Sequence, residues 1–519
     1  MLMRVILAVL LAPAIGCMLV APANASTLPS ATLVQLTPGA ACRAAAPLVR
    51  AGATAVAAEL RLYRMPRSAA SRVVPRLRAA GAVRLTQPDR IVGTLAATDF
   101  DDPLVPSEWW RQAVGVDTLT PPGPGKPVTI IDSGLDFYHP EFLERPNTQA
   151  MNAQEPAPLG GRHGTSVASL VGAPANGRGI VGIYPEAVLR SWDAAPGIGV
   201  ELETSQIISG ITAAANSDPG VINISLGGTR REILIEQAIY SAIRKGSLVV
   251  AASGNDGERG SPLGYPASVP HVLTVAATDR QNAAASFSSR SRFVDLAAPG
   301  DDIPIAVVEE SEYGTGSGTS FAAPLVSGAA AWVWTVRPKL TNTQLFEVMR
   351  RSARDIDAPG KDPATGYGLL DVPAALAYPA PPSDPMEPND DIDFVRPGGI
   401  YDTNIPPLTT RGRPGTTILA RVDAPEDPRD VYRVWLPRNA TFRAVLSADA
   451  DLDLTLWRQG TATVTQRLTG RNRLARAFTQ GPDETLTYRN TGPGQTAYLA
   501  VSMARGVREA TYRMRITAG

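Results

Sequence analysis

The sequence is poor in cysteine and histidine, and it has no excess of charge of either sign. Its 519 residues include two Cys, three His, and 49 Lys and Arg against 49 Asp and Glu. Proteins that bind nucleic acids or acidic membranes usually carry a large excess of basic charge, so a net charge of zero argues against both classes. A zero total still allows segments of opposite charge.

Long apolar runs are confined to the N-terminus. Arg4 precedes an apolar stretch, and residues 23–25 have the A-x-A pattern of a signal-peptidase site, so residues 1–25 are predicted to be a secretory signal peptide. The alternative is a lipoprotein signal with Cys17 as the lipidated residue, although apolar residues follow Cys17 where a polar tether is expected. No other stretch approaches the roughly 18–20 apolar residues of a membrane span. We therefore expect an exported mature chain with no membrane span.

Removal of residues 1–25 would leave Cys42 as the only thiol. This excludes an intramolecular disulfide and a cysteine-ligated metal site in the mature chain. Gly and Pro number 46 each, a content that fits a loop-rich globular protein rather than a disordered one. Stability is therefore expected from packing, with oxygen-ligated ions as an additional source.

Composition divides the exported chain into three segments. Residues 26–98 alternate strand-like and helix-like patterns, which predicts a small α+β unit. Residues 99–380 alternate β-branched runs with Ala-rich helical patterns, which predicts α/β architecture around a mostly parallel sheet. A Pro-rich linker, residues 378–385, leads into residues 381–519, whose short alternating strands predict an all-β sandwich.

The individual elements are expected at the following positions. In the first segment we expect strand patterns at 58–64 and 82–95 and a helix at 69–80. In the second segment we expect strands at 128–131, 220–224, 248–252 and 272–276 and a helix at 232–244. In the third segment we expect strands at 431–436, 441–446, 452–457, 497–503 and 511–517.

With three histidines, candidates for a general base are few. His163 opens an apolar helix and is flanked by Gly, so it can stand close to other chains, whereas His139 and His271 are expected in surface loops. Asp132 follows the strand 128–131, and functional groups gather at the carboxyl ends of parallel strands. The alternative for Asp132 is an N-cap or turn residue.

Ser320 lies where a Gly-rich loop, residues 314–318, runs into an apolar helix. A hydroxyl at that point lies at the positive end of the helix dipole, and Pro324 is tolerated near the first turn. The alternative for Ser320 is a simple N-cap. The sequence contains no G-x-S-x-G elbow, which argues against an α/β-hydrolase esterase.

The order Asp132, His163, Ser320 resembles that of the subtilisin-like serine proteases, the subtilase family (peptidase S8). The resemblance runs from about residue 102 to residue 378. It rests on eight motifs in order, which lie at 130–136, 163–168, 221–228, 249–257, 265–267, 286–289, 298–300 and 318–324. Two positions depart from the family pattern: Ser166 stands where a second His is usual, and Phe321 stands where Met is usual. The resemblance implies a subtilisin-like three-layer domain.

The resemblance also implies peptide-bond hydrolysis by acyl transfer without a cofactor. Ser320 would attack the carbonyl, His163 would take its proton, and Asp132 would orient the imidazole. The oxyanion would be held by the Asn255 side chain and the Ser320 N–H, the alternative for Asn255 being a turn residue. The resemblance also implies that the protein binds structural calcium. No ligand spacing identifies a metal site, although Asp301-Asp302 forms an acidic loop.

A protein or peptide substrate would bind as an added strand in this reading. The edge it would join consists of Ser225, Leu226, Gly227 and Gly228, where the two glycines would leave room for a second backbone. The other wall of the pocket would consist of Ala252, Ser253 and Gly254. Asp256 at the rim would bias this pocket towards basic residues.

Residues 26–98 occupy the place of a subtilase pro-region, which acts as a chaperone and inhibitor of its own protease. They carry ten Arg and two acidic residues, a charge of +8, whereas residues 99–380 carry 20 basic and 31 acidic residues, a charge of −11. Opposite charges favour encounter of the two segments. We expect a precursor that cleaves itself between residues 96 and 102.

The C-terminal segment resembles the bacterial pre-peptidase C-terminal domain, through Glu387-Pro-Asn-Asp390 and the strand patterns at 498–501 and 512–516. Such a domain would bind substrate or a surface, or assist secretion and then be trimmed. The sequence as a whole predicts a secreted bacterial serine endopeptidase. Two alternatives stay open, namely an exported binding or adhesion protein with an inactive subtilase core, and an esterase or lipase that uses the same triad.

Overall fold

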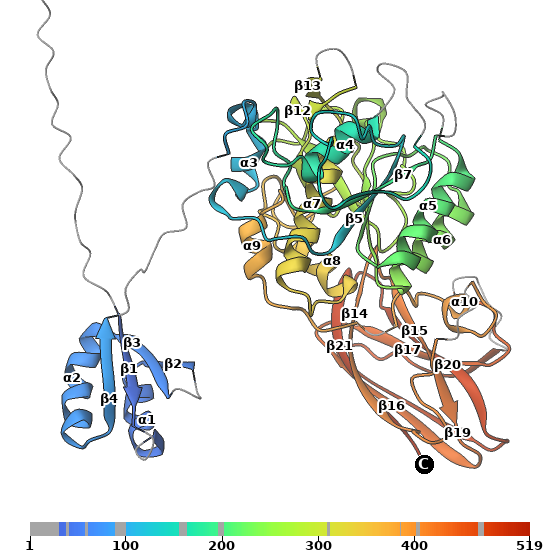
Figure 1. Cartoon of the computed structure of the whole chain (residues 1–519). Coiled ribbons are helices and arrows are strands. Elements are labelled where there is room, and N and C mark those ends of the chain that lie inside the picture. The colour runs from blue at the N-terminus through green and yellow to red at the C-terminus, as the bar shows by residue number, and fades with distance from the viewer. Residues whose placement is uncertain are drawn as a thin grey trace, which may run out of the picture. The chain divides into compact units, whose positions relative to one another are not determined.

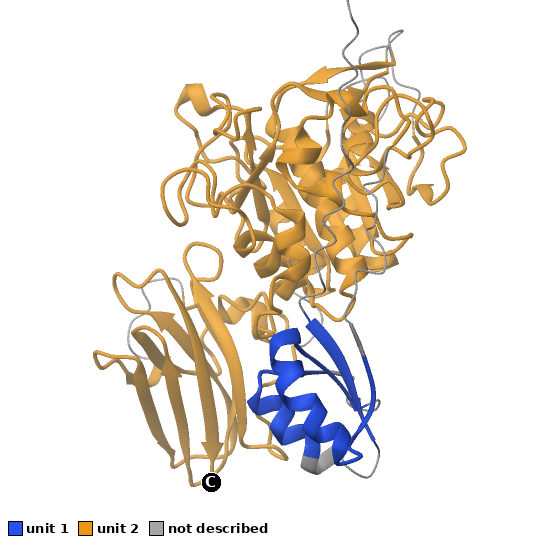
Figure 2. Cartoon of the chain, turned by 90° about the vertical axis from the view of Figure 1, so that its left-hand side faces the viewer, with its two compact units in different colours: residues 1–95 blue, residues 96–519 orange. Residues whose placement is uncertain are grey.

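The computed structural model describes residues 31–37, 41–57, 61–88, 100–154, 163–195, 202–308, 312–384, 386–400, 405–464 and 472–519. The predicted signal peptide, residues 1–25, and Cys17 lie outside the described residues. The chain divides into two units, residues 1–95 and 96–519 (Figure 2). In these described ranges no helix is long and apolar enough to cross a membrane.

The first unit is a four-stranded antiparallel sheet with two helices. The sheet has the order β2-β3-β1-β4, formed by Thr54–Ala57, Leu62–Pro66, Ala31–Leu36 and Val83–Pro88. Helices α1, Ala41–Arg50, and α2, Arg67–Ala79, share one core with β1 and β3. The α+β arrangement agrees with the expectation for this segment. Strand β1, ATLVQL, and helix α1, ACRAAAPLVR, were not predicted.

The second unit is built on a seven-stranded parallel sheet with the order β11-β10-β9-β8-β5-β7-β6. These strands are, in that order, Leu296–Pro299, Leu273–Thr278, Leu248–Ala252, Val221–Ile224, Pro127–Asp132, Val188–Asp193 and Thr148–Ala150. Residues of β5 and β8 are buried throughout. Burial on both faces explains their continuous apolar runs.

Helices cover both faces of this sheet, so the unit has three layers (Figure 1). Ile130 of β5 packs into the core under α4, His163–Gly172, and α7, Thr319–Val336. The next residue, Ile131, packs into the opposite core under α5, Thr204–Ser217, and α6, Ile233–Arg244. Successive side chains of a strand point to opposite faces, so one strand serves both layers. This arrangement confirms the predicted fold class.

The C-terminal region consists of two four-stranded antiparallel sheets that enclose one apolar core. One sheet has the order β14-β21-β16-β19, formed by Thr416–Asp423, Glu509–Ala518, Ala440–Ala448 and Asp483–Asn490. The other has the order β15-β20-β17-β18, formed by Arg429–Leu436, Gln495–Met503, Leu452–Arg458 and Arg473–Ala477. The all-β expectation is correct, although β14, β18 and β19 were not predicted.

The sandwich contacts the three-layer part through helix α8, Asn342–Arg351. The Nη2 atom of Arg351 lies 2.8 Å from Oε2 of Glu509 in β21, and Nη1 of Arg421 in β14 lies 2.6 Å from Oε2 of Glu347. In the Pro-rich segment, the carbonyl of Pro381 accepts a hydrogen bond of 2.7 Å from Gln344. The segment that joins the two parts is therefore bonded to the three-layer part.

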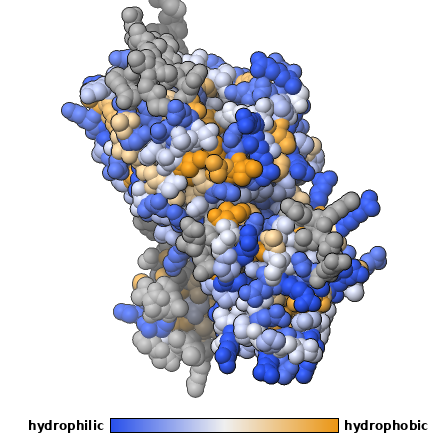
Figure 3. Space-filling view, turned by 90° about the vertical axis from the view of Figure 1, so that its right-hand side faces the viewer, coloured by the Kyte–Doolittle hydropathy of each residue, from blue (hydrophilic) through white to orange (hydrophobic). Residues whose placement is uncertain are grey.

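The surface over α5 and α6 is largely hydrophilic, with small apolar areas (Figure 3). Among the exposed large apolar residues are Ile233 and Leu234 at the start of α6, which are 60% and 63% exposed. Scattered apolar residues of this kind are usual on protein surfaces.

Candidate active site

A cavity of about 670 Å³ opens at the carboxyl ends of the central strands. Its walls come from the ends of β5, β8 and β9 and from the first residues of α4 and α7. Every residue that the sequence nominated for the site lines this cavity: Asp132, His163, Ser225, Leu226, Gly227, Gly228, Ala252, Ser253, Gly254, Asn255 and Ser320. The fold thus gathers residues that are up to 188 positions apart in the sequence.

Asp132 and His163 form a hydrogen-bonded pair. The Nδ1 atom of His163 lies 3.0 Å from both Oδ1 and Oδ2 of Asp132. Asp132 is buried, with 2% of its surface exposed. The backbone N–H of Ser133 donates a further bond of 2.7 Å to Oδ1. The His163 side chain is 40% exposed and faces the cavity. The negative charge of Asp132 raises the pKa of His163, and burial offsets part of that rise.

The glycine after His163 allows this close approach. A Cβ atom at Gly164 would lie 2.2 Å from the carbonyl oxygen of Gly134 and 3.2 Å from Cβ of Asp132. No side chain fits at that distance, so only Gly lets the start of α4 contact the loop after β5. The flanking Gly was the sequence signal for His163, and the structure gives its physical basis.

Ser320 is the second residue of α7 and is partly buried. Within the described part of the chain, its hydroxyl makes no hydrogen bond to His163, although both side chains line the same cavity. Such bonds are often long in the absence of substrate. The ring of Phe321 lies 5.7 Å from the His163 imidazole, centroid to centroid, so this departure from the family pattern touches the predicted base directly.

Asn255 is held by the first turn of α7. Its Oδ1 accepts hydrogen bonds of 2.9 Å from both the backbone N–H and the hydroxyl of Thr319. The Thr319 hydroxyl also accepts a bond of 3.1 Å from the N–H of Gly254, which has a φ of 106° that favours Gly. Because Oδ1 is occupied in this way, the amide NH₂ of Asn255 is left to face the cavity.

The predicted substrate edge is already paired on one side. Gly228 and Tyr265 exchange backbone hydrogen bonds of 3.0 and 2.8 Å. A Cβ atom at Gly227 would lie 2.7 Å from the carbonyl oxygen of Tyr265, whereas one at Gly228 would meet nothing within 4 Å. The expectation that both glycines leave room for a second backbone is thus wrong for Gly227, since the chain itself fills that space.

His139 and His271 lie in loops, as expected, but the expectation that these loops are at the surface is wrong. His139 is 4% exposed, its Nε2–H donates to the carbonyl of Glu312 over 2.8 Å, and its Nδ1 accepts from the N–H of Glu141. The Nε2–H of His271 donates to Asp390 over 2.9 Å, and its side chain is 11% exposed. Their partners are up to 173 residues away, a distance over which local patterns carry no information.

Charges near the cavity and in the acidic loop find partners on the surface. Nη1 of Arg259 lies 3.1 Å from Oδ1 of Asp256, which weakens the field that Asp256 was expected to project into the pocket. Asp302 lies 2.8 Å from Arg280.

The structure brings carboxylates together at another place, which the sequence analysis missed. They are Asp384, Glu387, Asp427 and Asp430. The segment that starts at Glu387 was noted only for its resemblance to a domain motif.

Known proteins resemble this chain over its central part. A model of the subtilase family matches residues 123–368. The chain is 35% identical over 251 residues to the subtilisin of Bacillus pumilus, an alignment that covers 48% of this chain and 90% of that protein. It is 36% identical over 247 residues to the minor extracellular protease Epr of Bacillus subtilis (strain 168), covering 48% of this chain and 38% of Epr. The chain belongs to the subtilase family.

Among solved structures, sphericase is 30% identical to this chain and matches 51% of it and 97% of the sphericase chain, with a TM-score of 0.44. The chain spans less than two thirds of the length of several curated relatives that it matches, for example 65% of subtilisin E of Bacillus subtilis (strain 168).

Proposed function

We propose that this protein is a secreted serine endopeptidase that hydrolyses peptide bonds through Asp132, His163 and Ser320. The observation that carries the proposal is the hydrogen-bonded Asp132–His163 pair in the cavity that Ser320 also lines. Membership of the subtilase family supports the same reaction class. The protein substrates, the secretion and the self-processing described below are parts of this proposal.

The reaction is acyl transfer in two steps. Ser320 Oγ attacks the peptide carbonyl carbon while Nε2 of His163 takes the hydroxyl proton, and the imidazolium then gives that proton to the departing amine. An ester between Ser320 and the acyl half of the substrate remains. Water hydrolyses this ester, with His163 again as base. Asp132 keeps the proton on Nδ1 and stabilises the imidazolium.

The negative oxygen of each tetrahedral intermediate is stabilised by two donors in this proposal. One is the amide NH₂ of Asn255, whose orientation is supported by the two bonds that Oδ1 accepts from Thr319. The other is the backbone N–H of Ser320 at the start of α7. Fixed donors in a cavity stabilise developing charge because they need no reorganisation during the reaction.

The substrate would lie as an extended strand along the edge that ends at Gly228. Backbone hydrogen bonds would hold it in register, since an exposed strand edge offers unpaired N–H and C=O groups. The side chain before the cut would enter the space beside Ala252, Ser253 and Gly254. Asp256, although paired with Arg259, lines the same cavity, so a modest preference for basic residues is part of the proposal.

Residues 26–98 are proposed to fold as an inhibitory pro-region that the protease removes from itself between residues 96 and 102. The antiparallel α+β unit and the opposite charges of the two segments support this. A Ser320→Ala protein should keep the pro-region, whereas the wild-type protein from the culture medium should begin near residue 99. Loss of the segment from purified Ser320→Ala without added protease would contradict self-processing.

The C-terminal sandwich is proposed to be a pre-peptidase C-terminal domain. Its eight antiparallel strands are compatible with the sequence resemblance noted for residues 387–390. Substrate binding by this domain can be tested by measuring KM for casein and for a short peptide, with the domain present and with the domain removed. A role in substrate binding requires KM to rise for casein alone.

The experiment that tests the proposed function combines labelling and hydrolysis. A fluorophosphonate should label wild-type protein at Ser320, and casein should be cleaved, whereas Ser320→Ala should fail in both assays. Ser217→Ala, at the exposed end of α5, is the matched control and should behave like wild type. A folded, processed protein that is not labelled would favour the inactive binding module, and labelling with ester hydrolysis but no casein cleavage would favour the esterase.

A further inference from the structure

A groove of about 340 Å³ lies between α6 and helix α10, Ile392–Val395. Arg231 and Glu236 line both this groove and the active-site cavity. The wall of the active-site cavity continues from Gly228 through residues 229–231 to the first turn of α6, where the lining of the groove begins. The groove therefore extends the active-site cavity.

One side of α6 forms the first wall of the groove. Four residues of the helix line it in steps of three or four, a spacing that places side chains on one side of a helix. They are Ile233, Glu236, Gln237 and Tyr240. Ile233 is 60% exposed, whereas Tyr240 is buried. These two residues are seven positions apart, so the wall is about 10 Å long along the helix axis.

The C-terminal region forms the opposite wall through Phe394, Ile400 and Pro428. The rings of Phe394 and Tyr240 lie 5.0 Å apart, centroid to centroid, in an edge-on arrangement. Nη1 of Arg244 donates a hydrogen bond of 3.1 Å to the carbonyl of Phe394, so α10 is bonded to the last turn of α6 (Figure 1). The match to the family model ends at residue 368, so this wall consists of residues that lie outside the match.

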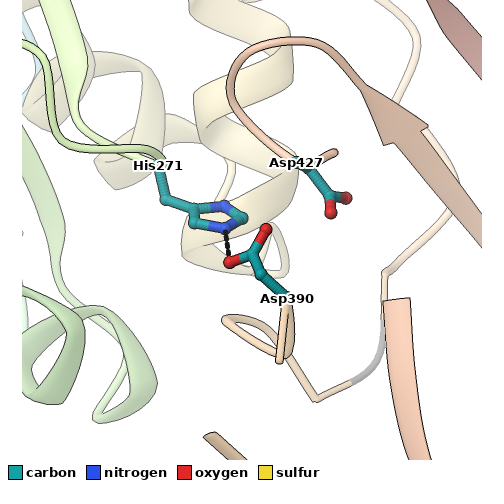
Figure 4. Close-up of side chains that lie close together, drawn as sticks. All are labelled: His271, Asp390 and Asp427. Atoms are coloured by element: carbon teal, nitrogen blue, oxygen red, sulfur yellow. Dashed lines mark hydrogen bonds and ion pairs between the residues drawn. The ribbon is translucent and has the colours of Figure 1, made fainter. Parts of the chain in front are cut away.

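Several charged side chains of the groove are already bonded within the protein. Glu236 accepts hydrogen bonds of 2.8 and 2.7 Å from the guanidinium of Arg231, and a third bond of 3.2 Å from the hydroxyl of Tyr240. In the same groove, Asp390 accepts a bond of 2.9 Å from His271 (Figure 4). A ligand gains little by replacing such bonds. The groove therefore offers a ligand mainly the apolar side chains of its two walls.

The position of the groove determines which part of a substrate can reach it. In the proposed function, the residues before the cut lie along the edge from Ser225 to Gly228, and a substrate that extends beyond Gly228 reaches Arg231 and the groove. An extended chain rises about 3.3 Å per residue, so a wall of about 10 Å accommodates about three residues. These residues belong to the acyl half of the substrate and lie further from the cut than those beside Gly228.

We propose that the groove between α6 and α10 binds an apolar segment of the protein substrate on the acyl side of the cut. This inference rests on the proposed function, because it extends the same substrate strand. An aliphatic side chain of the substrate would cover Ile233, and the burial of both apolar surfaces favours binding. The C-terminal region would thus take part in the selection of substrates.

The test uses the mature protein, with its C-terminal sandwich in place, and three p-nitroanilide substrates. All three end in the same four residues, so the bond that is cut and the leaving group are identical. The first substrate is the tetrapeptide itself. The second has six further residues at its N-terminus, with Leu at every second position, because alternate residues of an extended chain face the same side. The third has Ser in place of each Leu.

Two variants of the groove are compared with matched controls. Ile233→Asp places a charge in the wall of the groove, whereas Leu234→Asp places one at the next position, which is 63% exposed and does not line the groove. Both add an acidic residue to the first turn of α6, where the helix dipole favours it. Phe394→Ala removes the ring from the opposite wall. Its control is Phe478→Ala, at an exposed residue of the sandwich outside the groove.

The measured quantity is the ratio of kcat/KM for an extended substrate to kcat/KM for the tetrapeptide, since partial unfolding or a disturbed active site lowers both values alike. In wild-type protein this ratio should be about 10 for the Leu substrate, the gain expected when one aliphatic side chain is half buried, and about 1 for the Ser substrate. Ile233→Asp and Phe394→Ala should lose most of this gain, whereas Leu234→Asp and Phe478→Ala should keep it.

Three results would overturn the proposal while the proposed function stands, because the tetrapeptide is still hydrolysed. The first is no gain from the Leu extension in wild-type protein. The second is an equal gain from the Leu and Ser extensions, since the groove would then not select apolar side chains. The third is an equal loss of the gain in Ile233→Asp and Leu234→Asp. Failure to hydrolyse any of the three substrates would instead contradict the proposed function, and the role of the groove with it.

Discussion

Both carboxylate oxygens of Asp132 lie 3.0 Å from Nδ1 of His163. A carboxylate accepts hydrogen bonds only, so the Nδ1 atom of His163 must carry a proton, and in the neutral imidazole the lone pair is then on Nε2. The backbone N–H of Ser133 donates a further hydrogen bond to Oδ1 of the same carboxylate. The pair is therefore set in the tautomer that a general base for Ser320 requires.

Replacement of Asp132 by Asn should reduce kcat by about 10⁴-fold with little change in KM. The amide can donate to Nδ1 and so favours the wrong tautomer, while the shape of the site is kept. Peptide hydrolysis measures the effect, and an unchanged circular dichroism spectrum shows that the fold is retained. A loss of less than tenfold would mean that Asp132 does not orient the base.

The acid limb of the pH profile should report the raised pKa of His163. Because only neutral imidazole accepts the Ser320 proton, kcat/KM should fall as His163 is protonated. The charge of Asp132 raises the pKa of His163, so the inflection is expected above about 6.5, the ordinary value of His. An inflection at or below 6.5 in wild-type protein would contradict the charge effect assigned to Asp132.

The same pair should make stability depend on pH. The pKa of His163 is higher in the folded than in the unfolded chain, so its contribution is fully present below about pH 6.5 and is lost as pH rises through the folded pKa. Thermal unfolding of Ser320→Ala with and without Asp132→Asn measures it. The difference in Tm between the two proteins should be larger at pH 5.5 than at pH 9, and a constant difference would contradict the linkage.

Replacement of Asn255 by Ala should lower kcat by about 10²–10³-fold while KM changes little. The loss would come from the amide donor, although the two bonds from Thr319 to Oδ1 are lost as well. Asn152→Ala is the matched control. Asn152 makes hydrogen bonds of 2.7 and 2.8 Å to the backbone of Asp193, and it does not line the cavity. The control should lower Tm without lowering kcat, and equal kcat losses in both variants would exclude a specific role of Asn255.

Gly227 and Gly228 should respond differently to substitution by Ala. A Cβ at Gly227 would lie 2.7 Å from the Tyr265 carbonyl oxygen, so the backbone has to shift, whereas Gly228 has nothing within 4 Å. We expect Gly227→Ala to destabilise the protein by about 1–3 kcal/mol. Gly228→Ala should stay within about 0.5 kcal/mol of the parent. Denaturant unfolding in the Ser320→Ala background compares them, and equal effects would contradict the steric argument.

The sequence predicted elements well where burial is uniform. The runs at 128–131 and 248–252 correspond to β5 and β9, because strands buried on both faces are apolar throughout. Strand β7 was not predicted because Arg190 and Asp193 interrupt its apolar pattern. Strand β19 was not predicted because its exposed positions carry Asp, Thr and Arg, its buried face includes Glu484, and Leu486 is its only buried aliphatic residue.

By itself the sequence determined the order of the motifs, the segments of opposite charge and the residues nominated for the cavity. These depend on local patterns such as the glycine after His163, which is required by a contact of α4 with the loop after β5. Local patterns are readable because short-range sterics and periodic burial act on neighbouring residues.

Only the tertiary structure decided the environment of the charged groups. The assignment of His271 to the surface was wrong because its partner, Asp390, comes from a segment 119 residues away. The gathering of Asp384, Glu387, Asp427 and Asp430 likewise depends on how the linker packs against β15. The charge of a buried group is governed by everything that displaces water around it, and that is a property of packing between distant segments rather than of any one of them.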